Sequence, residues 1–139
     1  MFMTINEVSL MTGLSQDTLR YYERVGMIPR VTRTAGGTRN YGEEDIRWVN
    51  LAKCMRSAGL PVEVMIEYLE LFRQGDDTIP ARLELLREQM TVLEEQKRAV
   101  EETMERLSFK IDRYEDALVT GRLDWDGKDK DRNTDTKRG

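Results

Sequence analysis

The feature that most constrains this 139-residue chain is an apolar repeat that runs through its second half. From residue 83 to residue 118, the repeated side chains follow one another at alternating steps of three and four residues. Ten of the eleven positions are apolar, and the remaining one is a lysine. The positions are Leu83, Leu86, Met90, Leu93, Lys97, Val100, Met104, Leu107, Ile111, Tyr114 and Leu118. This period predicts the seam of a coiled coil and not the broad face of a globular helix.

A narrow apolar stripe of this length needs a partner helix, because a small domain cannot cover it alone. The simplest partner is the same helix of a second copy of the chain. Lys97 lies in the middle of the stripe and would face itself in an in-register parallel pair, which favours a shifted or antiparallel pairing. The sequence therefore predicts a homodimer that is joined by a coiled-coil helix over residues 76–121.

The start of the chain predicts two short helices. Thr4 is followed three residues later by Glu7, the spacing of a capping box, and this helix is expected to end before Gly13. Ser15 is placed to cap a second helix that ends near Val25. Two short helices joined by a tight turn that contains glycine form a helix-turn-helix unit.

A β-hairpin is predicted after the second helix. Residues 30–42 place Val, Thr and Tyr on either side of the pair Gly36-Gly37, which is a hairpin signal. Helices are then predicted over residues 43–58 and 62–73. A basic hairpin directly after a helix-turn-helix unit is typical of a winged arrangement.

The predicted fold is thus mostly α, with a winged helix-turn-helix domain over residues 1–75 and a coiled-coil dimerisation helix over residues 76–121. Residues 122–139 are polar, with Leu123 and Trp125 as their sizeable apolar side chains, so a disordered tail is expected there.

Charge points to DNA as the partner of the first domain. Residues 1–75 hold nine basic and nine acidic side chains, and eight of the nine basic residues are arginine. Arginine binds phosphate in a planar, two-pronged geometry. On the second helix Arg20 and Arg24 alternate with tyrosines, as a reader of the major groove requires. The alternatives are an amphipathic helix whose arginines pair with neighbouring acids, and a coiled-coil adaptor that binds protein.

Composition excludes several functions. The chain has no histidine and a single cysteine, which rules out Ser-His-Asp and Cys-His catalysis, histidine-ligated metals and four-cysteine zinc sites. We therefore expect no enzyme activity, no cofactor and no metal. No apolar run is long enough to cross a membrane and the start does not read as a signal peptide, so a cytoplasmic protein is expected.

Several ordered motifs resemble the signature of MerR-family transcriptional regulators. They are Thr18-Leu19-Arg20-Tyr21-Tyr22-Glu23, Gly26-Met27, Gly37-Thr38-Arg39-Asn40-Tyr41, Glu44-Asp45-Ile46 and Gly59-Leu60. The resemblance covers residues 4–118. It implies homodimers with an antiparallel coiled coil that bind promoter DNA, and that bend and untwist a promoter on which RNA polymerase also acts.

The resemblance, together with the face of the second helix, gives a set of candidate DNA-binding residues. They are Gln16, Arg20, Tyr22, Arg33, Thr38, Arg39, Tyr41 and Arg56. Thr38 departs from the family pattern, which usually has tyrosine there, and its hydroxyl is expected to keep the phosphate contact. Glu23 is left outside the set, as a residue that could orient an arginine.

Cys54 is the candidate residue for sensing the signal to which such a regulator responds. The segments around Cys54 and residues 74–86 resemble the aldehyde- and electrophile-responsive branch of the family, the AdhR- and NmlR-like regulators, in which a cysteine at this place is implicated in sensing. A thiolate is the reactive form, and Lys53 and Arg56 lie beside it in sequence. We expect an adduct to be strained by tight packing beside Leu51 and Ala58. A buried structural cysteine, a non-covalent ligand and a protein effector are the alternatives.

Overall fold

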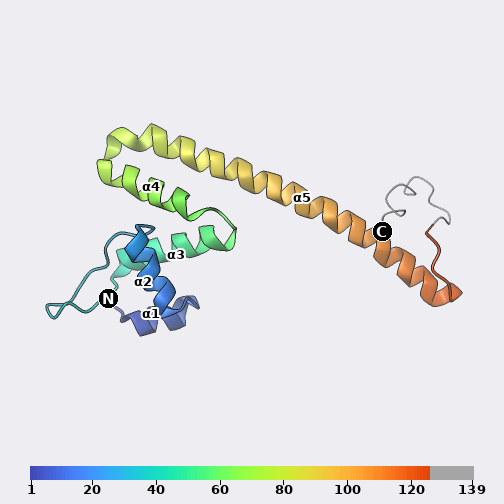
Figure 1. The fold of residues 1–139 in the computed structure, drawn as a ribbon, viewed down its shortest axis with the longest axis horizontal. Coiled ribbons are helices and arrows are strands. Elements are labelled where there is room, and N and C mark those ends of the chain that lie inside the picture. Colours follow the sequence, from blue (N-terminus) through green and yellow to red (C-terminus); the bar gives the residue numbers. More distant parts are fainter. Residues whose placement is uncertain (126–139) are drawn as a thin grey trace. The chain divides into compact units, whose positions relative to one another are not determined.

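The structure, a computed structural model, describes residues 1–125 and divides them into two compact units. The first unit contains residues 1–90, and the second begins at Thr91. The elements, shown in Figure 1, are the helices α1 (Ile5–Thr12), α2 (Gln16–Val25), α3 (Glu43–Ser57) and α4 (Val62–Gln74), the 3-10 helix η1 (Asp76–Thr78), and the long helix α5 (Ile79–Thr120). The prediction of a mostly helical, helix-turn-helix fold with a long C-terminal helix is confirmed. The predicted domain boundaries at residues 75 and 121 stay a prediction.

Helices α1 and α2 form where local capping chemistry favours them. The Thr4 hydroxyl accepts a hydrogen bond from the Glu7 backbone N–H at 3.1 Å, and the Glu7 carboxylate accepts one from the Thr4 N–H at 2.8 Å. The Ser15 hydroxyl accepts from the Thr18 N–H at 3.0 Å. Both helices end at a glycine with left-handed backbone, Gly13 at φ 78° and Gly26 at φ 87°. The predicted bounds of α2 agree with the structure.

The helices α1, α2, α3 and α4 and the segment between α2 and α3 share one hydrophobic core. Its buried members are Val8, Leu19, Tyr22, Met27, Ile28, Val31, Tyr41, Val49, Ala52 and Met65. Burying one large apolar side chain contributes about 1.5–3 kcal/mol. Because α2 and the chain that leaves it share this core, the orientation of α2 is coupled to the segment that follows.

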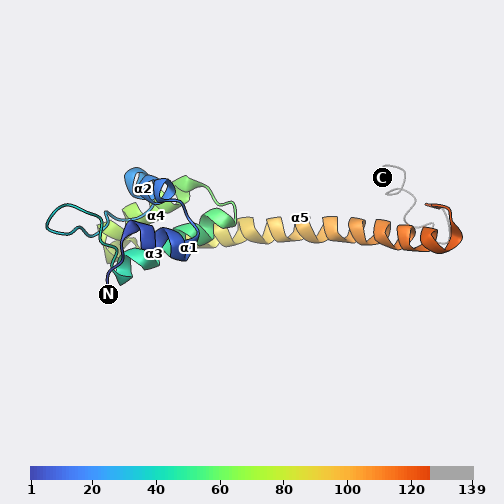
Figure 2. The same ribbon diagram turned by 90° about the horizontal axis from the view of Figure 1, so that it is seen from below.

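That segment forms the wing, which we define as residues 32–40. Its two sides meet through an antiparallel bridge between Arg33 and Arg39, and the Asn40 N–H donates to the Thr32 carbonyl at 2.7 Å. A turn closes the tip, where Gly37 has φ 86° and donates to the Thr34 carbonyl at 2.9 Å. The wing extends beyond the helices of its unit in both Figure 1 and Figure 2.

The base of the wing is fastened to the start of the chain. The Met3 N–H donates to the Tyr41 carbonyl and the Tyr41 N–H to the Met3 carbonyl, both at 2.8 Å. This antiparallel bridge adds the first residues to the hairpin, a pairing that sequence patterns did not predict.

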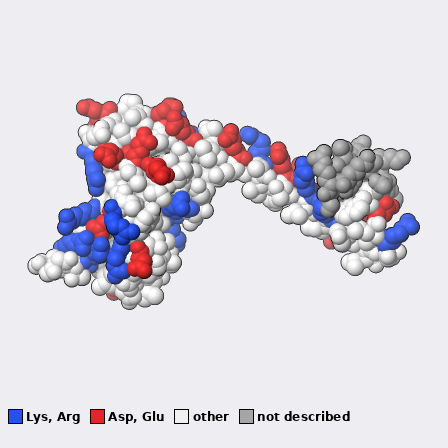
Figure 3. Space-filling view, in the orientation of Figure 1, with Lys and Arg blue, Asp and Glu red and all other residues white. Residues whose placement is uncertain are grey.

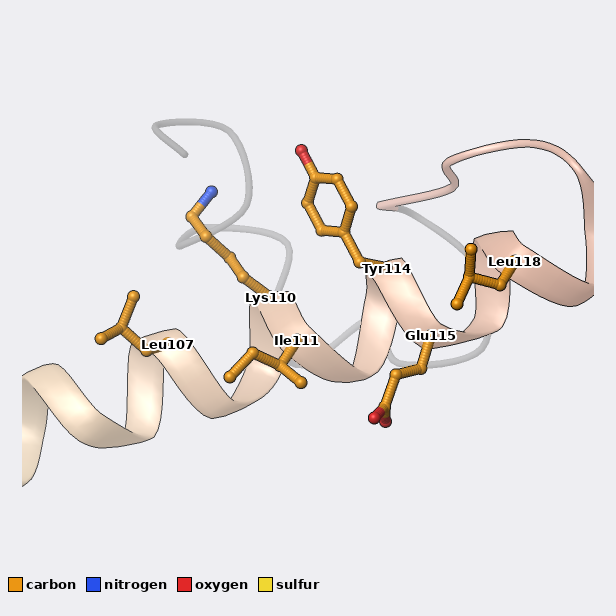
Figure 4. A pocket seen from close by; sticks show the side chains of 6 residues that line it. All are labelled: Leu107, Lys110, Ile111, Tyr114, Glu115 and Leu118. Carbon is orange, nitrogen blue, oxygen red and sulfur yellow. The ribbon is translucent and has the colours of Figure 1, made fainter.

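The second unit consists of the rest of α5 and a short return of the chain. The apolar stripe on α5 is largely exposed: Val100, Met104, Leu107, Ile111, Tyr114 and Leu118 all lie open to solvent. Leu107, Ile111, Tyr114 and Leu118 line a groove along the helix together with Lys110 and Glu115, as Figure 4 shows. Such a stripe is what the heptad pattern predicted.

The tail differs in part from the expectation of disorder. The Trp125 ring packs against Phe109 and Tyr114, with ring centroids 6.5 and 5.9 Å away, and Lys110 lies over it at 4.6 Å. One large aromatic ring therefore orders residues 122–125 against α5, where a count of apolar residues suggested too little to bury. The remainder of the predicted disordered tail, residues 126–139, lies outside the described residues.

Within residues 1–125, no helix is long and apolar enough to span a membrane.

Candidate nucleic-acid interface

The first turns of α2 present a connected polar face. The Arg20 guanidinium donates to Asp17 at 3.1 Å and to the Gln16 side-chain carbonyl at 3.2 Å. Gln16 in turn donates to the Asn6 side chain on α1 at 3.2 Å. Arg20 is therefore held in place by neighbours on two helices while its side chain stays 42% exposed. Gln16 and Arg20, one turn apart, form the part of α2 that is suited to enter a groove of DNA.

Two arginines of the wing converge on one carboxylate of α2. The Glu23 side chain accepts from Nε of Arg39 at 2.7 Å and from Nη2 of Arg33 at 3.0 Å. It also accepts from the Val31 backbone N–H at 3.0 Å. The Glu23 side chain is only 8% exposed, so these bonds are largely shielded from water. Glu23 thus orients two candidate DNA-binding arginines and fixes the wing to α2.

The same contacts explain the acidity of Glu23. Burial alone would raise the pKa of its carboxyl, but the hydrogen bonds from Arg39 and Val31 and the charges of Arg33 and Arg39 outweigh burial and hold the pKa below its ordinary value. Glu23 is therefore ionised at neutral pH.

The wing tip carries the other hairpin candidate. Thr38 is exposed, and its backbone N–H donates to the Thr34 hydroxyl at 3.2 Å while its carbonyl accepts from the Thr34 N–H at 2.8 Å. Its position is thus fixed by the turn and open to a partner. Lys and Arg side chains gather on the side of the first unit where the wing lies, as Figure 3 shows.

The two predicted tyrosines lie in the core and not on the surface. Tyr22 is 5% exposed and Tyr41 is fully buried, and burial raises the pKa of both hydroxyls. Among residues 1–125, the Tyr41 hydroxyl has no hydrogen-bond partner. A DNA phosphate cannot reach the Tyr41 side chain in this conformation. We therefore assign Tyr41 to the support of the wing, although its position in a family motif suggested a direct contact.

Arg56 lies at the end of α3, exposed, beside the turn that leads to α4. Its Nη1 donates to the Leu60 carbonyl at 2.6 Å and so fastens this turn, which contains Gly59 with φ 84°. The charge of Arg56 acts on the Tyr22 hydroxyl, so the turn lies near α2. Arg56 is available at a second edge of the candidate interface.

Cys54 is exposed, which contradicts the expectation of tight packing. Leu51, one of its expected neighbours, is itself exposed. Lys53 donates to the Thr12 carbonyl on α1, and Arg56 is engaged at Leu60. Cys54 and Leu51 lie on the solvent side of α3, opposite the buried Val49 and Ala52, which explains the difference. An adduct at Cys54 would form at a surface and would not be strained by a packed interior.

A basic hollow adds residues that sequence reasoning did not place together. It lies between the end of α2, the wing and the end of α4 and has a volume of about 460 Å³. Its lining is Glu23, Arg24, Val25, Gly26, Arg30, Arg33, Arg39 and Arg73. Arg73 is far from the wing in sequence, and no local pattern could have revealed this proximity. No group of three or more His, Cys, Asp or Glu side chains that could hold a metal ion occurs in the described part of the chain.

Comparison with known families finds the same architecture. Residues 3–71 match the family described as MerR HTH family regulatory protein, and residues 46–108 match the one described as MerR, DNA binding. The transcriptional regulator AdhR of Bacillus subtilis is 54% identical over 84 residues. That match covers 60% of this chain and 60% of AdhR, so this chain spans about three fifths of that relative's length.

Longer matches extend the likeness. An uncharacterised HTH-type transcriptional regulator of Haemophilus influenzae is 30% identical over 78% of this chain and 81% of its own. A MerR-family regulator from Listeria monocytogenes superposes with a TM-score of 0.81 at 39% identity, covering 99% of both chains. HiNmlR, described as a MerR family regulator lacking the sensor domain and bound to promoter DNA, has a TM-score of 0.80 at 28% identity over 88% of this chain and 98% of its own. These relatives are named as regulators, which confirms the prediction that this chain is not an enzyme.

Proposed function

Because the chain belongs to the MerR family of helix-turn-helix regulators, we propose that it is a homodimeric transcriptional regulator that binds and distorts promoter DNA. The observation that carries the proposal is the bridge from Glu23 to Arg33 and Arg39. This bridge makes α2 and the wing one rigid unit, so a protein that places α2 in a major groove also places two arginines on the neighbouring backbone.

The proposed contacts divide by role. Gln16 and Arg20 are proposed to contact base edges or phosphates in the major groove, and Arg33, Thr38 and Arg39 to contact the backbone beside it. Arg56 is proposed to contact the backbone at the other edge of α2. Tyr22 and Tyr41 support this surface from the core.

The proposed dimer rests on the exposed stripe of α5. An apolar seam that stays open to water is costly for a single chain, and a second copy of the helix would cover it. The antiparallel pairing avoids placing Lys97 opposite itself. In such a dimer two copies of α2 read the two halves of one operator, and their spacing decides whether straight or deformed DNA fits best. RNA polymerase would then meet a promoter whose shape the dimer has changed.

We further propose that a reactive aldehyde or thiol stress is the signal and that Cys54 receives it. The exposed thiol is reachable from solvent. Addition of the Cys54 sulfur to an aldehyde carbon forms a C–S bond, and the thiol proton passes to the carbonyl oxygen, so no oxidant is needed. The adduct shifts the equilibrium between two conformations of the dimer, and the size of the shift is limited by the difference in the free energy of the adduct between these conformations.

The DNA part of the proposal is tested by duplex binding. Fluorescence anisotropy on a duplex from the intergenic region beside the protein's own gene, over a salt series, should show tight binding that weakens linearly in log salt. Arg20→Ala should cost about 1–3 kcal/mol if Arg20 contacts a base. Arg106→Ala, an exposed arginine in the second unit, is the control and should leave binding unchanged.

Two outcomes would count against it. Equal binding by the wild type and Arg20→Ala, with both folded by circular dichroism, would remove α2 as the reading helix. A folded dimer that binds no duplex would favour the protein-binding adaptor instead.

A further inference from the structure

The basic hollow beside Glu23 contains arginines that are not among the proposed DNA contacts. Five guanidinium groups line it, against one carboxylate. Glu23 pairs with two of them, Arg33 and Arg39. Within residues 1–125, Arg30 and Arg73 have no acidic partner, and Nε of Arg33 has no hydrogen-bond partner. The hollow therefore holds cationic groups whose partner is not supplied by this part of the chain.

The negative ends of two helix dipoles offset part of the positive charge of the hollow, but not all of it. Arg24 is in the last turn of α2 and Arg73 in the last turn of α4, where arginines offset the negative end of the helix dipole. Each helix end is equivalent to about half a negative charge. Two such ends and one carboxylate leave a net charge of about +3 among five arginines, so the hollow attracts an anion.

The hollow continues the proposed reading face of α2. Arg20 and Arg24 are four residues apart and therefore lie one turn apart on the same side of the helix. The Arg24 guanidinium lies over the Tyr21 ring, 5.5 Å from its centroid, and this cation–π contact favours the observed side-chain conformation. Arg24 therefore lies next to the proposed reading face at Arg20 and also lines the hollow, together with Arg30 and Arg73.

The shape of the hollow favours a passing strand over a small ligand. Sites for small molecules are enclosed and mostly apolar, whereas this hollow is open and lined mainly by arginines. Guanidinium groups match the two oxygens of a phosphodiester. We infer that the hollow binds backbone phosphates of the operator DNA beyond the turn that α2 reads, with Arg24, Arg30 and Arg73 as further phosphate-binding residues. This inference rests on the proposed function.

The test uses the full-length protein and a pair of charge-matched double variants. Arg30→Ala/Arg73→Ala removes two cations that have no acidic partner, so the fold should be unaffected. Arg98→Ala/Arg106→Ala removes two exposed cations of the second unit and is the control. Because each phosphate contact contributes about 0.9 to the slope of log affinity against log salt, the first variant should reduce that slope by about 2, and the control should leave it unchanged.

Duplex length and free phosphate identify the anion. Shortening the duplex at its ends should weaken binding by the wild type and have a smaller effect on Arg30→Ala/Arg73→Ala, because the variant has already lost the outer contacts. An unchanged salt slope in this variant, with intact binding by the wild type, would overturn the inference alone. Saturable binding of inorganic phosphate in calorimetry without DNA, lost in the variant while its salt slope stays intact, would also overturn it, in favour of a small phosphorylated ligand. If the wild type binds no duplex at all, the proposed function fails and the inference fails with it.

Discussion

The Glu23 carboxylate of α2 accepts a hydrogen bond from Nε of Arg39 at 2.7 Å, across sixteen residues of chain. The bond joins the helix proposed to read DNA to the wing proposed to grip its backbone. Since Arg33 and the Val31 backbone bond to the same carboxylate, a single side chain sets the geometry of the candidate interface.

Replacing Glu23 by Gln tests this role directly. The variant keeps the size of the side chain but loses its charge, so the charge-assisted bonds to Arg33 and Arg39 weaken. We expect a loss of about 1.5–3 kcal/mol in the free energy of unfolding, measured by urea denaturation. Asp17→Asn removes a carboxylate from an exposed pair with Arg20 and, as the control, should cost less than about 1 kcal/mol. Equal costs for the two variants would mean that Glu23 is an ordinary surface acid.

The lowered pKa of Glu23 predicts a pH dependence of stability. The folded protein holds this carboxyl below its ordinary value of 4.5, so the unfolded chain takes up the proton first as the pH falls. The contribution of Glu23 is therefore fully present above about pH 4.5 and is lost as the pH falls toward the lower pKa of the folded state. Thermal unfolding of Glu23→Gln should depend less steeply on pH in this acidic range than that of the wild type. Parallel curves for the two proteins would contradict this.

The variant Tyr41→Phe tests whether Tyr41 supports the core or contacts DNA directly. Its hydroxyl is buried without a partner among the described residues, so Tyr41→Phe removes an unsatisfied polar group and little else. We expect the free energy of unfolding to stay the same or rise by up to about 1 kcal/mol, and affinity for the duplex to stay unchanged. A loss of DNA affinity without a loss of stability would instead show that Tyr41 leaves the core to touch DNA.

These residues show what the sequence can and cannot reveal. The caps at Thr4 and Ser15 act within a few residues, and the stripe on α5 repeats along one helix, so both could be predicted. The burial of Tyr41 and the proximity of Arg73 to the wing depend on contacts between distant segments. Tyrosine also suits both a core and an interface, so its identity alone did not decide its place. Cys54 was expected to be tightly packed beside Leu51 and Ala58, but the buried face of α3 runs through Val49 and Ala52, which leaves the thiol exposed.

The proposed dimer depends on the seam of α5. Replacing both Leu93 and Leu107 by Asp places charges at two stripe positions, where burial of apolar area would supply most of the association energy. We expect the variant to sediment as a monomer at micromolar concentration and to lose duplex binding with the dimer. Val92→Asp, on α5 but outside the stripe, is the control and should remain a dimer. A wild-type protein that is itself monomeric at this concentration would contradict the assembly proposal.

Cys54 gives the final prediction, which concerns the signal and not the fold. Serine keeps the size of the side chain but is a far weaker nucleophile, and an exposed position tolerates the change. Cys54→Ser should therefore bind the duplex as the wild type does but lose induction by formaldehyde in a promoter–reporter assay. The adduct is a reversible hemithioacetal, so added formaldehyde should slow the alkylation of the Cys54 thiol by iodoacetamide in the wild type, followed by mass spectrometry. The variant has no thiol at residue 54 and should not be alkylated there. Because Cys54 is exposed, the adduct acts through its contacts on the surface of α3 and not through strain in the core. A larger aldehyde should therefore still react with the Cys54 thiol but should give a different level of induction. If Cys54→Ser still responds fully, the aldehyde acts elsewhere, and a non-covalent ligand or a partner protein becomes the better explanation for the control of this regulator.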